Sequence, residues 1–90
     1  MNSDLDRAIL ELERTSLELA LSVSHRDPSF AGMIHARNEA AADLRRCDLS
    51  AASHAHLTRL RAVLVLGRQV ERSIRQWRES AVNELSAIAN

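Results

Sequence analysis

The chain has 90 residues, of which 46% are hydrophobic and 27% charged, and its formal net charge is zero. This length allows one domain with a small core, and no apolar run reaches the roughly 20 residues that a membrane span needs. The acidic start MNSDLDRAILELE differs from signal and transit peptides. We therefore expect a cytoplasmic protein with one domain over residues 1–90, in which the single cysteine, Cys47, is a partly buried thiol.

The composition predicts an all-α protein. Thirteen leucines and fourteen alanines accompany only two glycines and one proline, and a composition of this kind favours helix over strand. The expected fold is an antiparallel helical bundle of three helices at about 3–25, 28–47 and 50–89, of which the third is long and overhangs the other two.

The first predicted helix carries an apolar seam with the spacing of a bundle helix. The seam alternates steps of four and three residues, and its members are Leu5, Ile9, Leu12, Ser16, Leu19 and Val23. A second row of Leu10, Leu17 and Leu21 predicts that this helix contacts more than one neighbour. We expect the helix to end just before Asp27-Pro28, because proline disfavours helical geometry in the residue before it.

The second predicted helix begins with Asp27 as its N-cap and Pro28 in its first turn. At about 100° per residue, Arg37 falls in the middle of an apolar arc. The arc consists of Phe30, Met33, Ile34, Ala41 and Leu44. In an antiparallel pair Arg37 is level with Ser16, so we expect a buried polar contact that sets the register, with hydroxyls and Glu13 as acceptors. In the alternative interpretation, the aliphatic stem packs and the charged head reaches solvent.

The third predicted helix follows a tight turn in which Asp48 and Ser50 are the candidate caps. Its seam comprises Leu60, Val63, Gly67, Val70, Ile74, Trp77, Ala81, Leu85 and Ile88. Since no capping residue or proline follows Gly67, we expect a continuous helix with a point of close approach at this glycine. A break there, giving four short helices, is the structural alternative.

The third helix is predicted to extend beyond its neighbours. At ~1.5 Å per residue it approaches 60 Å, whereas the first two helices are each roughly 30 Å long. The antiparallel register brings Phe30 to about Arg68, so residues 69–90 are expected to overhang. Their apolar stripe predicts an interaction surface, covered by a client helix or by a second copy of the chain in a homo-oligomer. The predicted partner-binding residues are Val70, Ile74, Trp77, Ala81, Leu85 and Ile88.

The sequence predicts no catalytic group, cofactor or metal. His54 and His56 are two residues apart and point in opposite directions on a helix, and no glycine-rich phosphate loop, Cys-x-x-Cys pair or nucleophile motif occurs. Six arginines and one acid lie between Arg59 and Arg78, and such a charge attracts phosphates. Without aromatic stacking residues or a helix-turn-helix pattern, however, the row Arg61, Arg68 and Arg75, joined by Arg72, favours a solvated outer face over nucleic-acid binding.

The stretch RDPSFAGMIHARNEAAADL, residues 26–44, resembles the second helix of the FliT-type flagellar export chaperones. The shared features are an acidic turn, the aromatic Phe30, the pair Met33 and Ile34, the arginine Arg37 and the leucine Leu44. The long helix containing LGRQVERSIRQWRESAVNELSAI also suits that layout, although Phe30 stands where the family more usually has tryptophan. The resemblance implies a non-enzymatic chaperone that binds the amphipathic C-terminal helix of a flagellar subunit until export.

Overall fold

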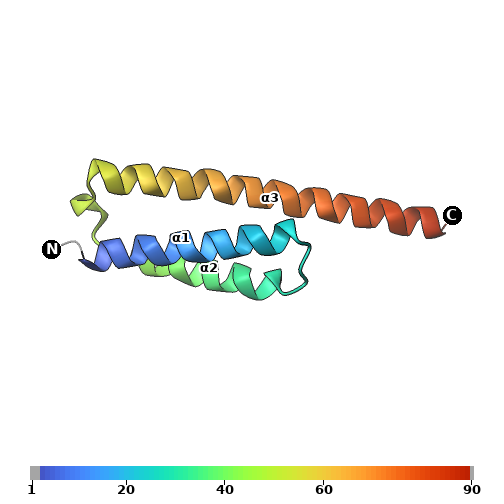
Figure 1. The fold of residues 1–90 in the computed structure, drawn as a ribbon, viewed down its shortest axis with the longest axis horizontal. Helices are drawn as coiled ribbons and strands as arrows, with labels where there is room; N and C mark the ends of the chain where they lie inside the picture. The colour runs from blue at the N-terminus through green and yellow to red at the C-terminus, as the bar shows by residue number, and fades with distance from the viewer. Residues whose placement is uncertain (1–2, 90) are drawn as a thin grey trace.

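A computed structural model describes residues 3–89 and confirms the all-α, three-helix fold (Figure 1). Helix α1 spans Ser3–Ser24, α2 spans Phe30–Arg45 and α3 spans His54–Ala89, with a 3₁₀ turn, η1, at Leu49–Ala51. In Figure 1 the chain runs from left to right through α1, back from right to left through α2, and from left to right again through α3. The expected domain over 1–90 also includes residues 1, 2 and 90, which lie outside the described residues.

The molecule is a tapering rod of 61 × 21 × 18 Å. Its length comes from α3, which has 36 residues against 22 in α1 and 16 in α2. Figure 1 shows α1 and α2 beside the N-terminal part of α3, while the C-terminal part continues alone. The helix is unbroken at Gly67, so the alternative with four short helices is wrong for the described chain.

Helix α1 ends in a Schellman motif ahead of the proline. Arg26 has a left-handed φ of 53°, and its N–H donates to the carbonyl oxygen of Val23 at 3.0 Å. The N–H of Asp27 donates to the carbonyl oxygen of Ser22 at 2.9 Å. These two bonds satisfy carbonyls that the helix end leaves open, so backbone geometry as well as Pro28 stops the helix.

The predicted cap of α2 was wrong. The carboxylate Oδ1 of Asp27 accepts a hydrogen bond from the N–H of Ser29 at 2.9 Å and so closes a turn before the helix. Helix α2 therefore begins at Phe30 and ends at Arg45, two residues inside each predicted boundary. Asx turns of this kind use the same acidic side chain as an N-cap, which explains why the sequence pattern did not distinguish them.

Helix α3 begins later than predicted because η1 occupies the expected start. Asp48 Oδ1 accepts from the N–H of Ser50 at 3.0 Å and from its hydroxyl at 2.6 Å, so Asp48 caps η1 and Ser50, the other predicted cap, lies inside it. The cap of α3 is Ser53, whose Oγ accepts from the N–H of His56 at 3.2 Å. In return, His56 Nδ1 accepts from the N–H of Ser53 at 3.0 Å. This reciprocal pair is a capping box in which histidine takes the usual place of glutamate.

The predicted seam of α1 is buried along its whole length. Two clusters of apolar side chains join it to the other helices. The first comprises Leu12, Ala40 and Val63 with Ala41, Leu44 and Leu60. The second comprises Leu19, Val23 and Val70 with Ala20, Phe30, Met33, Ile34 and Ile74.

The register of α3 against α2 differs from the prediction by more than one helical turn. The Phe30 ring packs on Trp77, with centroids 5.1 Å apart, instead of reaching Arg68. The cause is the connection over residues 46–53, which includes η1 and consumes more residues than the tight turn expected there. The overhang predicted to start at residue 69 therefore starts beyond Trp77.

Candidate partner-binding surfaces

Arg37 lies beside Gly67. A Cβ atom added at Gly67 would be only 2.8 Å from Arg37 Nη2, so the glycine provides the space that the guanidinium occupies. Within residues 3–89 no hydrogen bond or ion pair joins Arg37 to another residue, and Glu13, one of its predicted acceptors, pairs with Arg59. The expected hydrogen-bonded form of the Arg37 contact is therefore wrong, because Arg59 takes its acidic partner.

Ser16 and Arg37 nevertheless line the same cavity, which has a volume of about 150 Å³. Ser16 is buried, and its Oγ has no hydrogen-bond partner in the described chain. Arg37 is half-buried. The two polar residues that interrupt the seams of α1 and α2 thus face one internal space, between the two apolar clusters.

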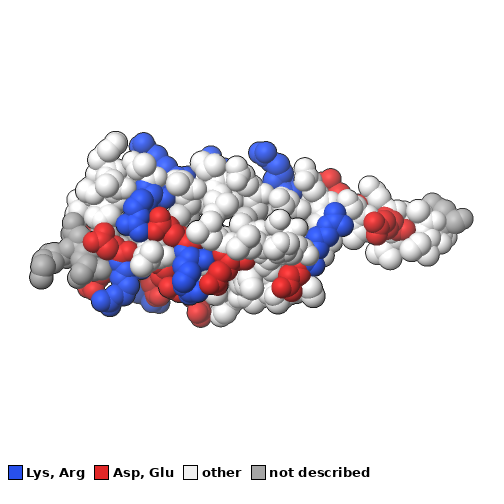
Figure 2. All heavy atoms as spheres, viewed as in Figure 1, with Lys and Arg blue, Asp and Glu red and all other residues white. Residues whose placement is uncertain are grey.

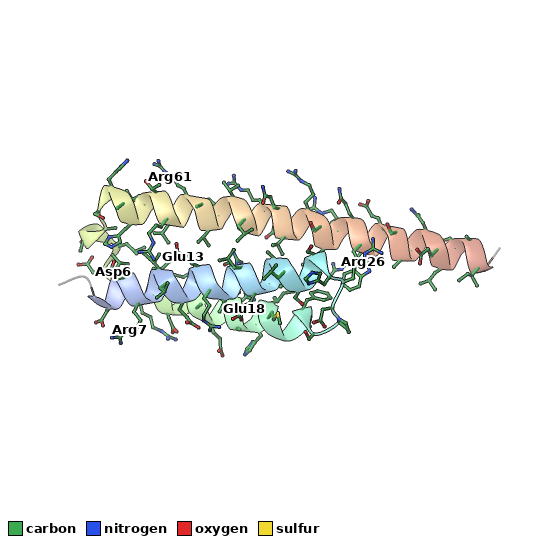
Figure 3. All side chains as sticks on the ribbon, in the orientation of Figure 1. Asp6, Arg7, Glu13, Glu18, Arg26 and Arg61 are labelled. Atoms are coloured by element: carbon green, nitrogen blue, oxygen red, sulfur yellow. The ribbon has the colours of Figure 1, made fainter. Side chains whose placement is uncertain are left out.

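Two polar contacts that the sequence did not reveal join α1 to α3 at the wide end of the rod (Figure 3). Asp6 Oδ1 lies 2.5 Å from His56 Nε2. Because His56 Nδ1 already accepts from Ser53, Nε2 carries the ring proton and donates it to Asp6. Histidine at a capping position, with an acid fifty residues earlier, gives no local signal of such a pair.

The second of these contacts is a bidentate ion pair between Glu13 and Arg59. The guanidinium Nε lies 3.2 Å from Oε2, and Nη2 lies 2.5 Å from Oε1. Hydrogen bonding to Arg59 holds the pKa of Glu13 below its ordinary value. The same hydrogen bond raises the pKa of Arg59, so both groups keep their charges and fix α1 against α3.

The C-terminal end of α3, residues 78–89, is exposed throughout, and we call it the projection. It includes three of the six predicted partner-binding residues: Ala81, Leu85 and Ile88. Leu85 is 65% exposed and Ile88 81% exposed. The other three, Val70, Ile74 and Trp77, are buried or half-buried against α1 and α2. The prediction of an open surface is therefore wrong for these three residues, which pack within the three-helix part of the molecule.

A second apolar surface lies on α1. Helix α1 does contact more than one neighbour, as predicted, since it packs against both α2 and α3. The row on which that prediction rested takes no part in these contacts: Leu10, Leu17 and Leu21, the leucine stripe, are 61%, 56% and 60% exposed. Two acids of α1, Asp6 and Glu13, form polar contacts with α3. Leu10 lies four residues after Asp6, and Leu17 lies four residues after Glu13. Residues four apart share a helix side, so the stripe borders the junction with α3.

Helix α3 borders the same junction with an uncharged stripe: Gln69, Ser73, Gln76, Ser80 and Asn83. All five are exposed and fall within an arc of about 80° on the helix. Four of them, with Val23, Ser24 and other residues, line a cleft of about 540 Å³ where α1 ends. The leucine stripe and the uncharged stripe together form what we call the α1–α3 face.

The arginine row of α3 lies elsewhere on the helix. Arg61, Arg68 and Arg75 are exposed, as is Arg72, and Figure 3 shows Arg61 pointing away from the other helices. Figure 2 shows charged groups of both signs gathered over the wide half of the molecule. The row is therefore a solvent-exposed outer face, as the sequence favoured.

Among the described residues no group of three or more His, Cys, Asp or Glu side chains is placed to hold a metal ion. None of the helices within residues 3–89 combines the length and apolarity required to cross a membrane. Neither a protein-family model, a curated protein nor a solved structure matches the chain. The projection and the α1–α3 face are therefore the features of the chain that bear on its function.

Proposed function

We propose that the protein is a non-enzymatic chaperone or adaptor that receives an amphipathic helix of another protein on its α1–α3 face. The observation that carries this proposal is the leucine stripe, whose three members remain more than half exposed beside the uncharged stripe of α3. Exposed apolar stripes of this kind mark binding surfaces. Helix recognition by a hydrophobic surface uses anchors three, four and seven residues apart.

A helix is the occupant that this face favours. Helices α1 and α3 run side by side (Figure 1), and a further helix laid between them would turn the three-helix part into a four-helix bundle. The apolar side of that helix would cover the leucines, while polar side chains would meet the amides and hydroxyls of the uncharged stripe.

We further propose that the client is a flagellar export substrate and that binding takes place in the cytoplasm. This part of the proposal is supported by the resemblance of residues 26–44 to the FliT-type chaperones. Phe30, Met33 and Ile34 from that stretch serve here to pack α2 against α1 and α3, so the resemblance concerns the scaffold more than the binding surface.

The test is a titration with a fluorescent peptide containing the C-terminal amphipathic helix of a flagellar export substrate from the organism that encodes the chain. We expect saturable binding by the wild type and its loss in Leu17→Glu. A matched control is Leu64→Glu, which introduces the same charge at a leucine 51% exposed on another side of α3 and should bind normally.

Two results would contradict the proposal. Failure of every such peptide to bind would exclude the flagellar client, and equal binding by Leu17→Glu and the wild type would exclude the α1–α3 face. Nucleic-acid binding through Arg61, Arg68 and Arg75 is the alternative. Tight binding to DNA or RNA that weakens steeply with salt would support it instead.

A further inference from the structure

We infer that two copies of this chain pair antiparallel, with the projection of each copy lying on the α1–α3 face of the other. The inference involves the face assigned above to a client, but it requires no client. It assigns the projection, the leucine stripe and the uncharged stripe to a single self-complementary interface.

The shape of the molecule supports this pairing. One half of the rod contains three helices and the other half contains α3 alone (Figure 1). An antiparallel two-fold arrangement sets the wide half of each copy beside the narrow half of the other, so each projection becomes a fourth helix for its partner. The same surface then serves both copies, as a two-fold interface requires.

The apolar groups agree in position with this arrangement. Leu12 packs with Val63 and Leu19 with Val70, so the leucine stripe lies beside residues 61–72 of α3. If the partner's projection, residues 78–89, lies antiparallel over residues 61–72, the two-fold axis falls midway between these two stretches of α3. That midpoint is close to Gln76. In this register the partner's Leu85 meets Leu17, and the apolar seam that α1 and α2 leave uncovered in the projection is buried.

The uncharged stripe is self-complementary about the same axis. With Gln76 opposite its own copy, Gln69 lies opposite the partner's Asn83, and Ser73 lies within one residue of the level of the partner's Ser80. Amides and hydroxyls carry both donors and acceptors, so each pair can hydrogen-bond across an antiparallel helix contact. The register was set by placing the projection over the leucine stripe. The same register brings the polar side chains of the two uncharged stripes together.

Charge does not oppose the pairing. The exposed arginines of the row, Arg61, Arg68 and Arg75, lie outside the arc of the uncharged stripe. On α1, Arg14 lies on the same side of the helix as the leucine stripe, four residues after Leu10 and three before Leu17. Its charge is balanced by ion pairs with Glu11 and Glu18. A partner helix laid on this face thus meets no row of like charges. The cleft of about 540 Å³ at Gln76, which Arg26 and Glu79 also line with one charge of each sign, lies where the two copies would meet and leaves space for side chains from the partner.

Cysteine cross-linking tests the register. In a Cys47→Ser background, Gln76→Cys should form a disulfide-linked dimer on mild oxidation, because the two side chains face each other at the axis. The matched control is Arg75→Cys, one residue away on the outer face, which should remain monomeric under the same conditions. A second variant, Leu17→Cys with Leu85→Cys, should also give a covalent dimer and checks the contact between projection and stripe.

A wild-type chain that is monomeric by light scattering at high micromolar concentration would overturn the inference. So would cross-linking of Arg75→Cys as readily as Gln76→Cys. Peptide binding by such a monomer would leave the proposed function standing. Conversely, cross-linking in the expected register by a chain that binds no flagellar peptide would support the dimer and count against the client.

Discussion

The two ends of α3 have similar sequence patterns and different surroundings. Val63, Val70 and Trp77 lie on the seam of the N-terminal end and pack against α1 and α2. Leu85 and Ile88 continue that seam on the C-terminal end and are exposed. The pattern therefore predicts which side of the helix is apolar, whereas the lengths of the neighbouring helices decide where that side is buried.

This difference has an energetic consequence. Helices shorter than about 12–15 residues are marginal in water, and most helical stability in proteins comes from packing of the apolar side. The three-helix part has such packing, and the projection has none within the chain. We therefore expect substitutions at equivalent seam positions to have unequal effects.

The largest contrast is expected between Leu12→Ala and Leu85→Ala. Leu12 is 6% exposed in the core, and its truncation should lower the free energy of unfolding by about 2–5 kcal/mol. In solutions dilute enough to disfavour association, Leu85→Ala should change it by less than about 0.5 kcal/mol. Urea denaturation followed by circular dichroism measures both, and equal losses would show that the projection is packed within the monomer.

His56→Ala should destabilise the start of α3, at the opposite end from the projection. The substitution removes both the hydrogen bond to Asp6 and one half of the capping box. We expect a loss of about 2 kcal/mol in the free energy of unfolding. Asp6→Asn keeps an acceptor for the histidine, so in the same urea experiment it should cost less. A loss in Asp6→Asn equal to that in His56→Ala would contradict this division of roles.

Arg37→Leu should stabilise the three-helix part by about 1 kcal/mol. The guanidinium has no hydrogen-bond partner within the described chain, and leucine would place apolar atoms in the cavity beside Ile34 and Ile74. Thermal and urea unfolding of the variant measure the change. A clear loss of stability would mean that the Arg37 guanidinium contributes a polar interaction that sets the register, as the sequence first indicated.

The smallest expected effect concerns pH. Since Arg59 lowers the pKa of Glu13 in the folded state, the pair contributes stability above the ordinary glutamate pKa near 4.5 and loses it as the pH falls. Both side chains are partly exposed, so the contribution should stay below about 1 kcal/mol. Glu13→Gln should therefore be less stable than the wild type at pH 7, by a difference that shrinks as the pH falls below 4.5, and a constant difference would contradict this assignment.

The sequence predicted the helices well because periodic spacing and strong helix formers act locally. It predicted their ends less well, since Asp27 and Asp48 can cap a turn or a helix with the same carboxylate. The start of the projection depended on the length of the connection over residues 46–53, which no seam residue encodes. The exposure of Leu10, Leu17 and Leu21 was missed for a related reason, because a row of leucines has the same pattern whether its covering helix comes from the same chain or from another.

If the uncovered seam of α3 is an interface between two copies, the mass of the protein in solution depends on its concentration. Sedimentation equilibrium over a range of concentrations measures that mass for the wild type and for Leu85→Glu. We expect the wild type, at 10.0 kDa per chain, to double its mass as concentration rises, while Leu85→Glu remains a monomer with unchanged helix content. A wild-type chain that keeps the mass of a single copy at every concentration, or a variant that dimerises equally well, would show that the seam is not such an interface.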